Sequence, residues 1–384
     1  MLVNFGYFLS VGVMQPILPL YVHGPLHQSN VAVGVALAAF TVTALALRQP
    51  SGRLGDARGR QLPILVGTIV NVISVLGFLL ATNLVHVVAL RMLTGVAEAF
   101  IFVGVATAVQ DLAPDERRGE AASLFSLSLF FALAIGPLIG EWILTHYGFH
   151  AVWWFEGAAG TIAIVFAATL PDTRTDEARP KEPPPLIHPA SIRPGAILGC
   201  AIWGLAAFNG YVPLYATLVL HMKNFSPVFL VNAVVILIFR SVGAKLPDRL
   251  GHLRTARFSL VCTPIGLAVM GLFRTVPSLY IGAIILAVGQ ALAFPALMSI
   301  AVNNAPGSER GAVMGTFTAF FDISFGGGAL VLGVISGAIG YNKAFLSAAA
   351  VAALGLGGIM FLPPKVSAPS GPPRPVFEIE PPGE

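Results

Sequence analysis

The sequence predicts an all-α polytopic membrane protein in which twelve transmembrane helices form two six-helix bundles related by pseudo-twofold symmetry. Three observations predict this fold class. Hydrophobic residues make up 56% of the 384 residues and charged residues only 10%, whereas soluble domains carry about 25% charged residues. Twelve apolar runs are long enough to cross a bilayer, which takes about 20 helical residues. The two halves of the chain also repeat the same motifs at a fixed spacing.

Charge and motif content exclude several classes of protein. So few charges cannot cover a water-facing surface, which excludes a soluble enzyme and a nucleic-acid-binding protein. The chain lacks the G-x-x-x-x-G-K-[ST], H-E-x-x-H and G-x-S-x-G signatures, and its histidines have no metal-like spacing. We therefore predict no enzyme activity, no cofactor and no metal site. Cys200 and Cys262 lie in apolar runs, where we interpret them as small core residues.

The spans are bounded by Pro, Gly and charge clusters. The first six are predicted at 2–22, 31–50, 62–81, 84–110, 120–146 and 150–170, and the second six at 196–221, 226–245, 253–273, 277–303, 310–338 and 341–362. We expect an N-terminal bundle over 1–170, a cytoplasmic linker over 171–195, a C-terminal bundle over 196–362 and a disordered cytoplasmic tail over 363–384. The tail is rich in Pro and has no apolar run.

The placement of basic residues predicts the orientation, because short loops rich in Lys and Arg stay in the cytoplasm. One side of the predicted alternation holds most of the basic loop residues, and the other holds only Lys223, Arg274 and Lys343. Both termini are therefore predicted to be cytoplasmic, which requires an even number of spans. The abundance of Ala, Gly and Val, and of Arg over Lys, favours a bacterial source and hence the plasma (inner) membrane.

The two halves of the chain match at an offset of 192 residues. Four residues at and after the end of the second span recur at and after the end of the eighth span. Four residues that follow the fourth span recur after the tenth span. Such a parallel duplication implies two bundles related by an axis along the membrane normal, with a shared cavity near the midplane, as alternating access requires. The matched sets are Arg48, Leu54, Asp56 and Gly59 with Arg240, Leu246, Asp248 and Gly251, and Ala113, Pro114, Arg118 and Gly119 with Ala305, Pro306, Arg310 and Gly311.

The segment from residue 50 to residue 60 is predicted to be a cytoplasmic loop. Its glycines permit a tight turn and its arginines anchor the cytoplasmic face. The pattern G-x-L-x-D-x-x-G-R resembles the signature between helices two and three of the major facilitator superfamily. That resemblance implies a gating loop, in which the Asp56 carboxylate meets the positive end of helix eleven when the cytoplasmic side is closed; a plain positively charged turn is the alternative. The pattern is carried by Gly52, Leu54, Asp56, Gly59 and Arg60. The predicted gating loop also includes Arg58 and, in the second copy, Asp248, where Pro247 and His252 depart from the pattern.

Span four carries Arg91, Gly95 and Glu98. Seven residues return to nearly the same face of a helix, about 10 Å along its axis, so Arg91 and Glu98 can point at one cavity. The segment is similar to the R-x-x-x-G element of proton-coupled members of the superfamily, although Thr94 stands where Gln is common. The alternative is that Arg91 only pairs with helix-end carbonyls or headgroups.

Asp322 is the remaining ionisable residue deep in a predicted span. A carboxyl group held away from water binds a proton more readily than an exposed one. We therefore predict that Glu98 and Asp322 carry the coupled protons, with Arg91 beside them. Glu141 and Glu156 lie near the predicted outer ends of their spans, where we expect solvated surface positions.

Span five carries Gly136, Pro137 and Gly140 after Ala132. Small residues let helices approach closely, and proline removes one backbone hydrogen bond. The segment resembles the antiporter motif of the twelve-helix drug/metabolite:proton antiporter branch, which implies export. The alternative is close helix packing alone.

The predicted substrate surface combines neutral hydrogen-bonding and aromatic side chains, which would suit small amphipathic molecules. The scarcity of deep basic residues other than Arg91 argues against phosphate esters and polycarboxylates. The predicted residues are Gln15, Phe208, Asn209, Tyr211, Gln290 and Phe321.

Together these patterns predict a secondary active transporter that exports small amphipathic molecules, drugs or metabolites, in exchange for protons by alternating access. Its expected partners are the small-molecule substrate, protons and the lipid bilayer, without nucleic acid, and we expect a monomer. Two alternatives stay open. One is a proton-coupled or facilitative importer or exporter of a nutrient such as a sugar, and the other is a non-transporting receptor or lipid-handling protein on the same fold.

Overall fold

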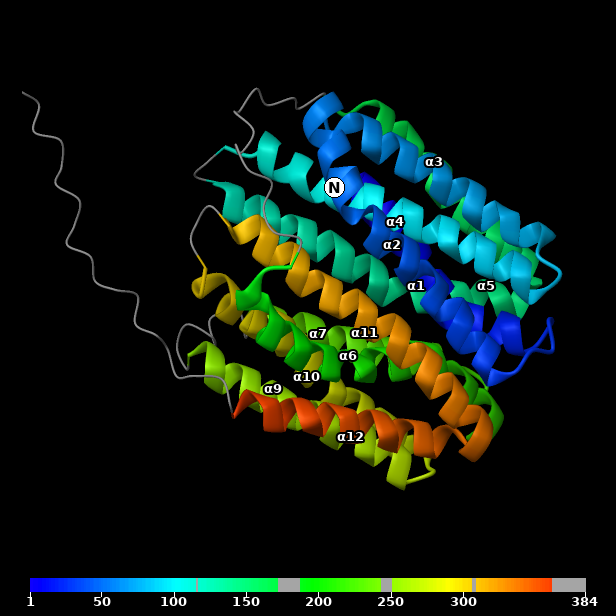
Figure 1. Ribbon diagram of the computed structural model, residues 1–384. Helices are drawn as coiled ribbons and strands as arrows, with labels where there is room; N and C mark the ends of the chain where they lie inside the picture. Colours follow the sequence, from blue (N-terminus) through cyan, green and yellow to red (C-terminus); the bar gives the residue numbers. More distant parts are fainter. Residues whose placement is uncertain (115–116, 172–186, 243–250, 306–308, 361–384) are drawn as a thin grey trace, which may run out of the picture.

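The computed structural model of the chain describes residues 1–114, 117–171, 187–242, 251–305 and 309–360. These residues are almost entirely helical and contain no strand, and the helices run side by side along one direction (Figure 1). The first half contains α1 (Leu2–His23), α2 (Asn30–Arg58), α3 (Gln61–Gly77) followed by the 3₁₀ turn Phe78–Leu80, α4 (Leu84–Leu112) and α5 (Arg118–Ala168). The second half contains α6 (Pro189–Leu214) followed by the π turn Tyr215–Val219, α7 (Ser226–Val242), α9 (His252–Leu272), α10 (Val276–Asn303), α11 (Arg310–Ile339) and α12 (Tyr341–Ile359).

Ten of the helices in the described ranges are long and apolar enough to cross a membrane, and α7 is a shorter apolar helix. One of the ten, α5, has 51 residues and is broken at Gly148, whose backbone leaves the helical region at φ +80°. Dividing α5 at this residue gives eleven long spans, and α7 makes twelve. This confirms the predicted all-α polytopic fold.

The turns between helices repeat between the two halves. Gly59 and Gly251 have φ of 88° and 87°, and Gly148 and Gly340 have φ of 80° and 91°. The members of each pair are 192 residues apart. Glycine adopts positive φ without the steric cost that a side chain brings. The offset seen in the loop motifs is therefore also present in the backbone of the helix–helix turns.

Two predicted boundaries are wrong. The second helix continues through Pro50 to Arg58, so most of the predicted loop is helical and only Gly59 makes the turn. The helix α6 starts at Pro189 instead of residue 196, because proline fits the first turn of a helix and the His188 side chain accepts the Ala190 N–H. The predicted linker thus overlaps α6, while residues 172–186 and the predicted tail 363–384 lie outside the described residues.

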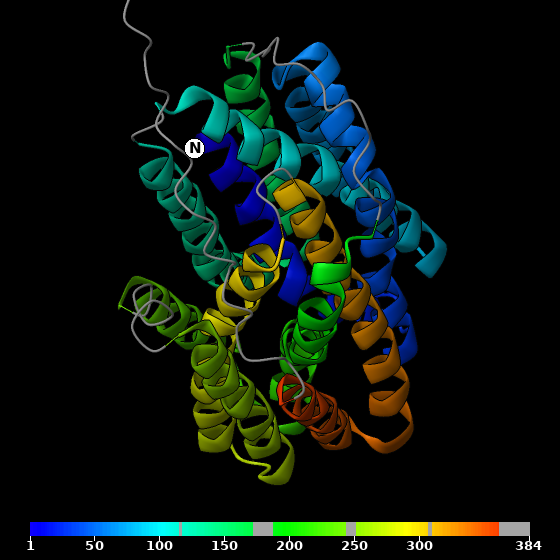
Figure 2. The same ribbon diagram turned by 60° about the vertical axis from the view of Figure 1, so that its left-hand side comes forward.

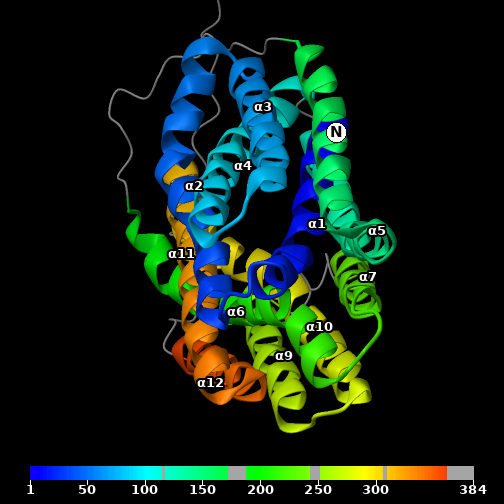
Figure 3. The ribbon, with the colours of Figure 1, turned by 90° about the vertical axis from the view of Figure 1, so that its right-hand side faces the viewer.

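Helices α1 to α5 gather on one side of the molecule and α6 to α12 on the other (Figures 2 and 3). The two groups meet where α2 packs on α11, α1 on α6 and α5 on α7. We call the end that holds Met1, Gly59 and Ile359 the near end, and the end that holds Gly148 and Gly340 the far end.

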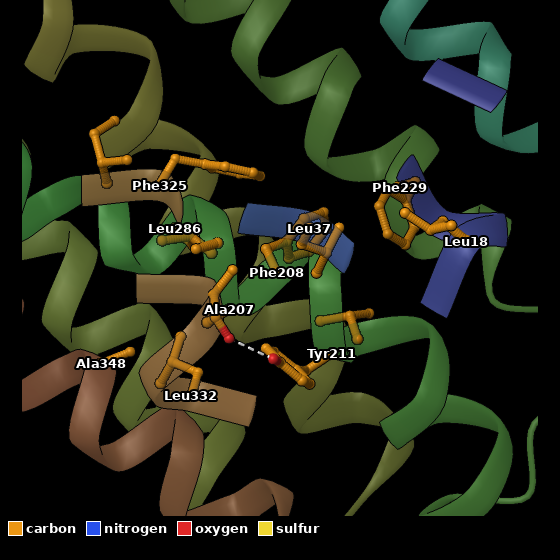
Figure 4. Close-up of a cluster of buried hydrophobic side chains, with 14 of the residues drawn as sticks. Leu18, Leu37, Ala207, Phe208, Tyr211, Phe229, Leu286, Phe325, Leu332 and Ala348 are labelled. Atoms are coloured by element: carbon orange, nitrogen blue, oxygen red, sulfur yellow. Dashed lines mark hydrogen bonds between the residues drawn. The ribbon is translucent and has the colours of Figure 1, made fainter. Parts of the chain in front are cut away.

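A single hydrophobic cluster crosses the boundary between the two groups. Leu18 and Leu37 of the first group lie near Phe208 and Phe229 of the second (Figure 4). Gly210 makes this approach possible, since a Cβ atom there would lie 2.6 Å from a Leu37 methyl group. The two groups are thus packed firmly together in this conformation.

Candidate functional site

Two hydroxyl groups of α1 each bind a carboxyl group of a neighbouring helix. Tyr7 donates a hydrogen bond to Glu98 of α4. Ser10 donates to Glu156 of α5, with 2.9 Å between Oγ and Oε2. Residues three apart on a helix lie on one face. The face of α1 that carries these hydroxyls therefore holds two acidic groups from two other helices side by side.

Arg91 lies close to both acids. Its side chain is buried, its Nε donates to the carbonyl of Ala36 over 3.2 Å, and its guanidinium lies 4.7 Å from the centre of the Phe40 ring. It is within electrostatic range of Tyr7, Glu98 and Glu156. The structure thus brings Arg91 and Glu98 together, as their spacing predicts. The carbonyl that Arg91 binds belongs to the second turn of α2.

An ion pair joins the two groups of helices. Arg48 of α2 and Asp322 of α11 approach to 3.0 Å between Nη2 and Oδ2, with side-chain exposures of 16% and 9%. The guanidinium of Arg48 also lies 5.8 Å from the centre of the Phe102 ring. Arg48 and Glu98 are within electrostatic range of each other, as are Glu98 and Asp322. Arg48 therefore has acids of both groups beside it.

Sequence reasoning missed Arg48 as a site residue, because the predicted second span ended at residue 50 and left Arg48 at its edge. The continuation of α2 past Pro50 places this arginine inside the bundle. Arg240, its counterpart 192 residues later, lies 3.8 Å from the centre of the Phe130 ring. Deep basic residues other than Arg91 are therefore less scarce than predicted from the sequence. The available signal was that both arginines belong to the repeated motif.

The predicted solvated positions of Glu141 and Glu156 are also wrong, since their exposures are 6% and 0%. Glu141 accepts the N–H groups of Phe225 at 2.6 Å and Ser226 at 2.9 Å, and also the Ser226 hydroxyl. The first N–H groups of a helix lack partners within it, so this carboxylate caps α7. Position along a helix does not reveal such burial, because the covering groups come from other helices.

The segment similar to the antiporter motif packs α5 against α1. A Cβ atom on Gly136 would lie 2.7 Å from the Cα of Gly12, and one on Gly140 would lie 3.0 Å from a Val13 methyl group. Pro137 lies inside α5 next to this contact. The backbones of α1 and α5 therefore approach each other closely at Gly12, two residues beyond Ser10.

The predicted gating loop forms the end of α2 and its turn into α3. Arg60 Nε and Asp111 Oδ2 of α4 are 3.0 Å apart, and a Cβ on Gly55 would lie 3.0 Å from the Arg60 guanidinium. Arg58 is exposed, and Gly52 and Leu54 lie half-buried within α2. The side chain of Asp56 and all of Asp248 lie outside the described residues, so the contact expected of Asp56 with helix eleven is not described.

The predicted substrate residues divide into two sets. Phe208 and Tyr211 are core residues in this conformation and do not line a free surface: Tyr211 donates to the Ala329 carbonyl over 2.5 Å (Figure 4), and Phe208 packs on Phe229. Asn209 is also buried. Gln15, Gln290 and Phe321 are half-buried, and both polar atoms of the Gln290 amide lack a hydrogen-bond partner among the described residues.

No cluster of three or more His, Cys, Asp or Glu residues that could hold a metal ion occurs in the described ranges. The site consists instead of hydroxyl, carboxyl and guanidinium groups. Such groups can exchange hydrogen-bond and ion-pair partners and can bind protons.

Comparison with known proteins gives one consistent result. The family model described as Major Facilitator Superfamily matches residues 1–325 and 228–381. An uncharacterized MFS-type transporter of Salmonella typhimurium is 29% identical over 91% of this chain and 92% of its own. Multidrug resistance protein 2 of Bacillus subtilis is 26% identical over 92% of this chain and 91% of its own length. The crystal structure of a POT family transporter in complex with 5-aminolevulinic acid superposes with a TM-score of 0.79 at 14% identity, covering 94% of each chain, which shows a shared fold.

Proposed function

This chain belongs to the major facilitator superfamily, and on that premise we propose that it is a secondary active transporter that exports small amphipathic molecules, drugs or metabolites, in exchange for protons. The observation that carries the proposal is the Arg48–Asp322 ion pair, which joins the two groups of helices beside the Glu98 carboxyl group. An ionisable residue inside a membrane is costly and marks a functional site by default.

The charges around Arg48 give a physical basis for proton coupling. One guanidinium can neutralise one carboxylate, and Arg48 has both Glu98 and Asp322 within electrostatic range. The carboxyl group that is not paired with the Arg48 guanidinium is stabilised by binding a proton. Because Glu98 lies in α4 and Asp322 in α11, the choice of partner changes how the two bundles are joined. Protonation and bundle movement are then linked through one arginine.

The far-end contacts support alternating access between two bundles, which we assign to residues 1–170 and, with the whole of α6 included, 189–362. Tyr341 of α12 donates to the Asn30 side chain over 3.0 Å, and Glu141 caps α7. Following the positive-inside pattern, we assign the far end to the outside of the plasma membrane and both termini to the cytoplasm. The outer side is then closed in this conformation, and opening it requires these contacts to break.

Two observations support export. Gly136 and Pro137 form the element similar to the antiporter motif, and one relative is named a multidrug resistance protein. We propose Gln15, Gln290 and Phe321 as substrate contacts, with Asn209 added when the outer side opens. The unpaired amide of Gln290 offers a donor and an acceptor to a weakly polar molecule. The transporter is proposed to act as a monomer.

The test is proton movement in proteoliposomes with an acidic lumen and a trapped pH dye. Lipophilic cations, antibiotics and sugars are added outside one at a time. We expect lipophilic drugs to raise the luminal pH, and the double variant Glu98→Gln, Asp322→Asn to lose this response. Full coupled transport in that variant would contradict the assignment of the two acids.

The same assay separates the alternatives. A response to sugars alone, or sugar flux without proton movement, would replace the export proposal by nutrient transport. Failure to move any solute or proton would favour a receptor or lipid-handling protein.

A further inference from the structure

Glu156 is a buried acid that the proposed coupling through Arg48 does not use. Its side chain is 0% exposed, Ser10 donates to Oε2, and Oε1 has no hydrogen-bond partner among the described residues. Within those residues it also has no ion pair within 4.0 Å. A buried carboxylate with a single hydroxyl donor is poorly compensated, so such a group favours its neutral form.

The position of Glu156 on α1 relates it to Glu98. Ser10, which binds Glu156, lies three residues after Tyr7, which binds Glu98. Side chains three apart on a helix are neighbours, so the two acids occupy adjacent sites along one face of α1. Each hydroxyl can donate and accept a hydrogen bond. The pair therefore lies on a row of groups that can hold and pass a proton.

The other charges around this pair are few. From α4, Arg91 is within electrostatic range of both acids, and from α2, Arg48 reaches Glu98 but is bound to Asp322. The helix α3 contributes no charge where it packs on the Glu156 segment: Leu76 meets Gly157, and Val72 and the neutral Asn71 meet Gly160. Arg91 is thus one cation facing two acids.

We propose that Glu98 and Glu156 bind one proton between them, and that this two-carboxyl site holds the coupling proton while the far end is closed. With Arg91 cationic, one ionised and one protonated carboxyl group leave the site neutral. The inference rests on the proposed function for its biological role, but its test needs no transport. It adds Glu156, in the N-terminal bundle, as a proton-binding residue.

The experiment is infrared spectroscopy of the purified full-length protein in lipid at neutral pH, with H₂O exchanged for D₂O to identify the carbonyl stretch of a protonated carboxyl group. The wild type is expected to show this band. Glu156→Gln and Glu98→Gln should each lose it, because Arg91 then neutralises the single remaining acid. Arg91→Gln should roughly double it. Ser10→Ala, which keeps both acids, should shift the band because a hydrogen bond to Glu156 is lost.

Glu120→Gln is the control. Glu120 is an exposed glutamate paired with Arg117, away from both acids and from the far end, so its replacement should leave the band unchanged. A band that persists in both Glu98→Gln and Glu156→Gln, or that is absent from the wild type, would overturn the proposal. If the band behaves as expected while no proton transport is found, the shared site stands and the proposed function fails.

Discussion

The two long contacts between the bundles, α2 with α11 and α5 with α7, occupy equivalent places in the duplicated chain but use different chemistry. With the offset of 192 residues between the two halves, Arg240 is the equivalent of Arg48, and Phe130 is the equivalent of Asp322. Arg48 forms an ion pair with Asp322 at 3.0 Å, whereas Arg240 lies 3.8 Å from the centre of the Phe130 ring. The duplication has kept the arginine and exchanged its partner.

The far ends of the same two contacts differ as well. In the α2–α11 contact, Gly34 and Gly333 let the two helices touch. A Cβ atom on Gly34 would lie only 2.6 Å from the Ala329 carbonyl oxygen, so a larger residue there would keep the helices apart. In the α5–α7 contact, the residue equivalent to Gly34 is Ser226 and the residue equivalent to Gly333 is Glu141. There the Glu141 carboxylate caps α7 by accepting the Ser226 N–H. Only the α2–α11 contact places a carboxylate in the partner position of its arginine. We infer that protons act on the α2–α11 contact, whereas the α5–α7 contact opens and closes without binding the coupled proton.

The largest effect is expected from Asp322→Asn, because it leaves the Arg48 cation without its partner. Removing one member of a buried ion pair costs about 3–5 kcal/mol, whereas replacing both members costs much less. The double variant Arg48→Gln, Asp322→Asn should therefore recover most of the lost stability. Thermal unfolding of the purified protein measures this, and equal losses in the single and double variants would contradict it.

Gly34→Ala should prevent the far ends of α2 and α11 from closing. The added methyl group meets backbone atoms that cannot move aside, and such overpacking costs about 1–3 kcal/mol. We expect a longer distance between spin labels at Val31 and Ile339, which are exposed residues at these ends. Gly327→Ala, at a glycine of α11 with open space around it, is the control, and an equal distance in both variants would argue against the role of Gly34.

Glu141→Gln should loosen the far end of the α5–α7 contact. A hydrogen bond to a charged group contributes about 1.5–3 kcal/mol, and a change of about 1.4 kcal/mol alters a population tenfold. Spin labels at the exposed residues Tyr147 and Lys223 should show a larger open fraction. Glu120→Gln, at an exposed glutamate paired with Arg117, should leave that fraction unchanged. A closed distance that persists in Glu141→Gln would show that the cap does not hold this end.

Phe130→Leu should have the smallest effect. A cation–π contact contributes about 0.5–2 kcal/mol, so transport should slow only a few-fold and the ratio of protons to substrate should stay the same. Parallel measurement of the two fluxes in proteoliposomes checks this. Loss of proton coupling comparable with that in Asp322→Asn would remove the difference between the two contacts.

The fold was largely predictable because its signals are local. Apolar runs give the spans, and the repeated motifs give the symmetry that Gly148 and Gly340 display in the backbone. Boundaries failed at Pro50 and Pro189, where proline lies inside or at the start of a helix.

The site was only partly predictable, because burial depends on partners distant in the chain. Ser10 and Glu156 are 146 residues apart, and Glu141 and Phe225 are 84 apart. No periodicity within one helix reveals such pairs. Spacing along α4 did predict that Arg91 and Glu98 lie together, and comparison of the two halves could have identified Arg48.

The central claim is that the Arg48–Asp322 contact ties proton binding to bundle movement. It is tested most directly by measuring proton flux and labelled-substrate counterflow in proteoliposomes containing the charge-neutral double variant Arg48→Gln, Asp322→Asn. We predict that counterflow, which needs no proton gradient, is retained while proton-driven accumulation of substrate is lost. Accumulation driven by a proton gradient at the wild-type level in this variant would contradict the claim.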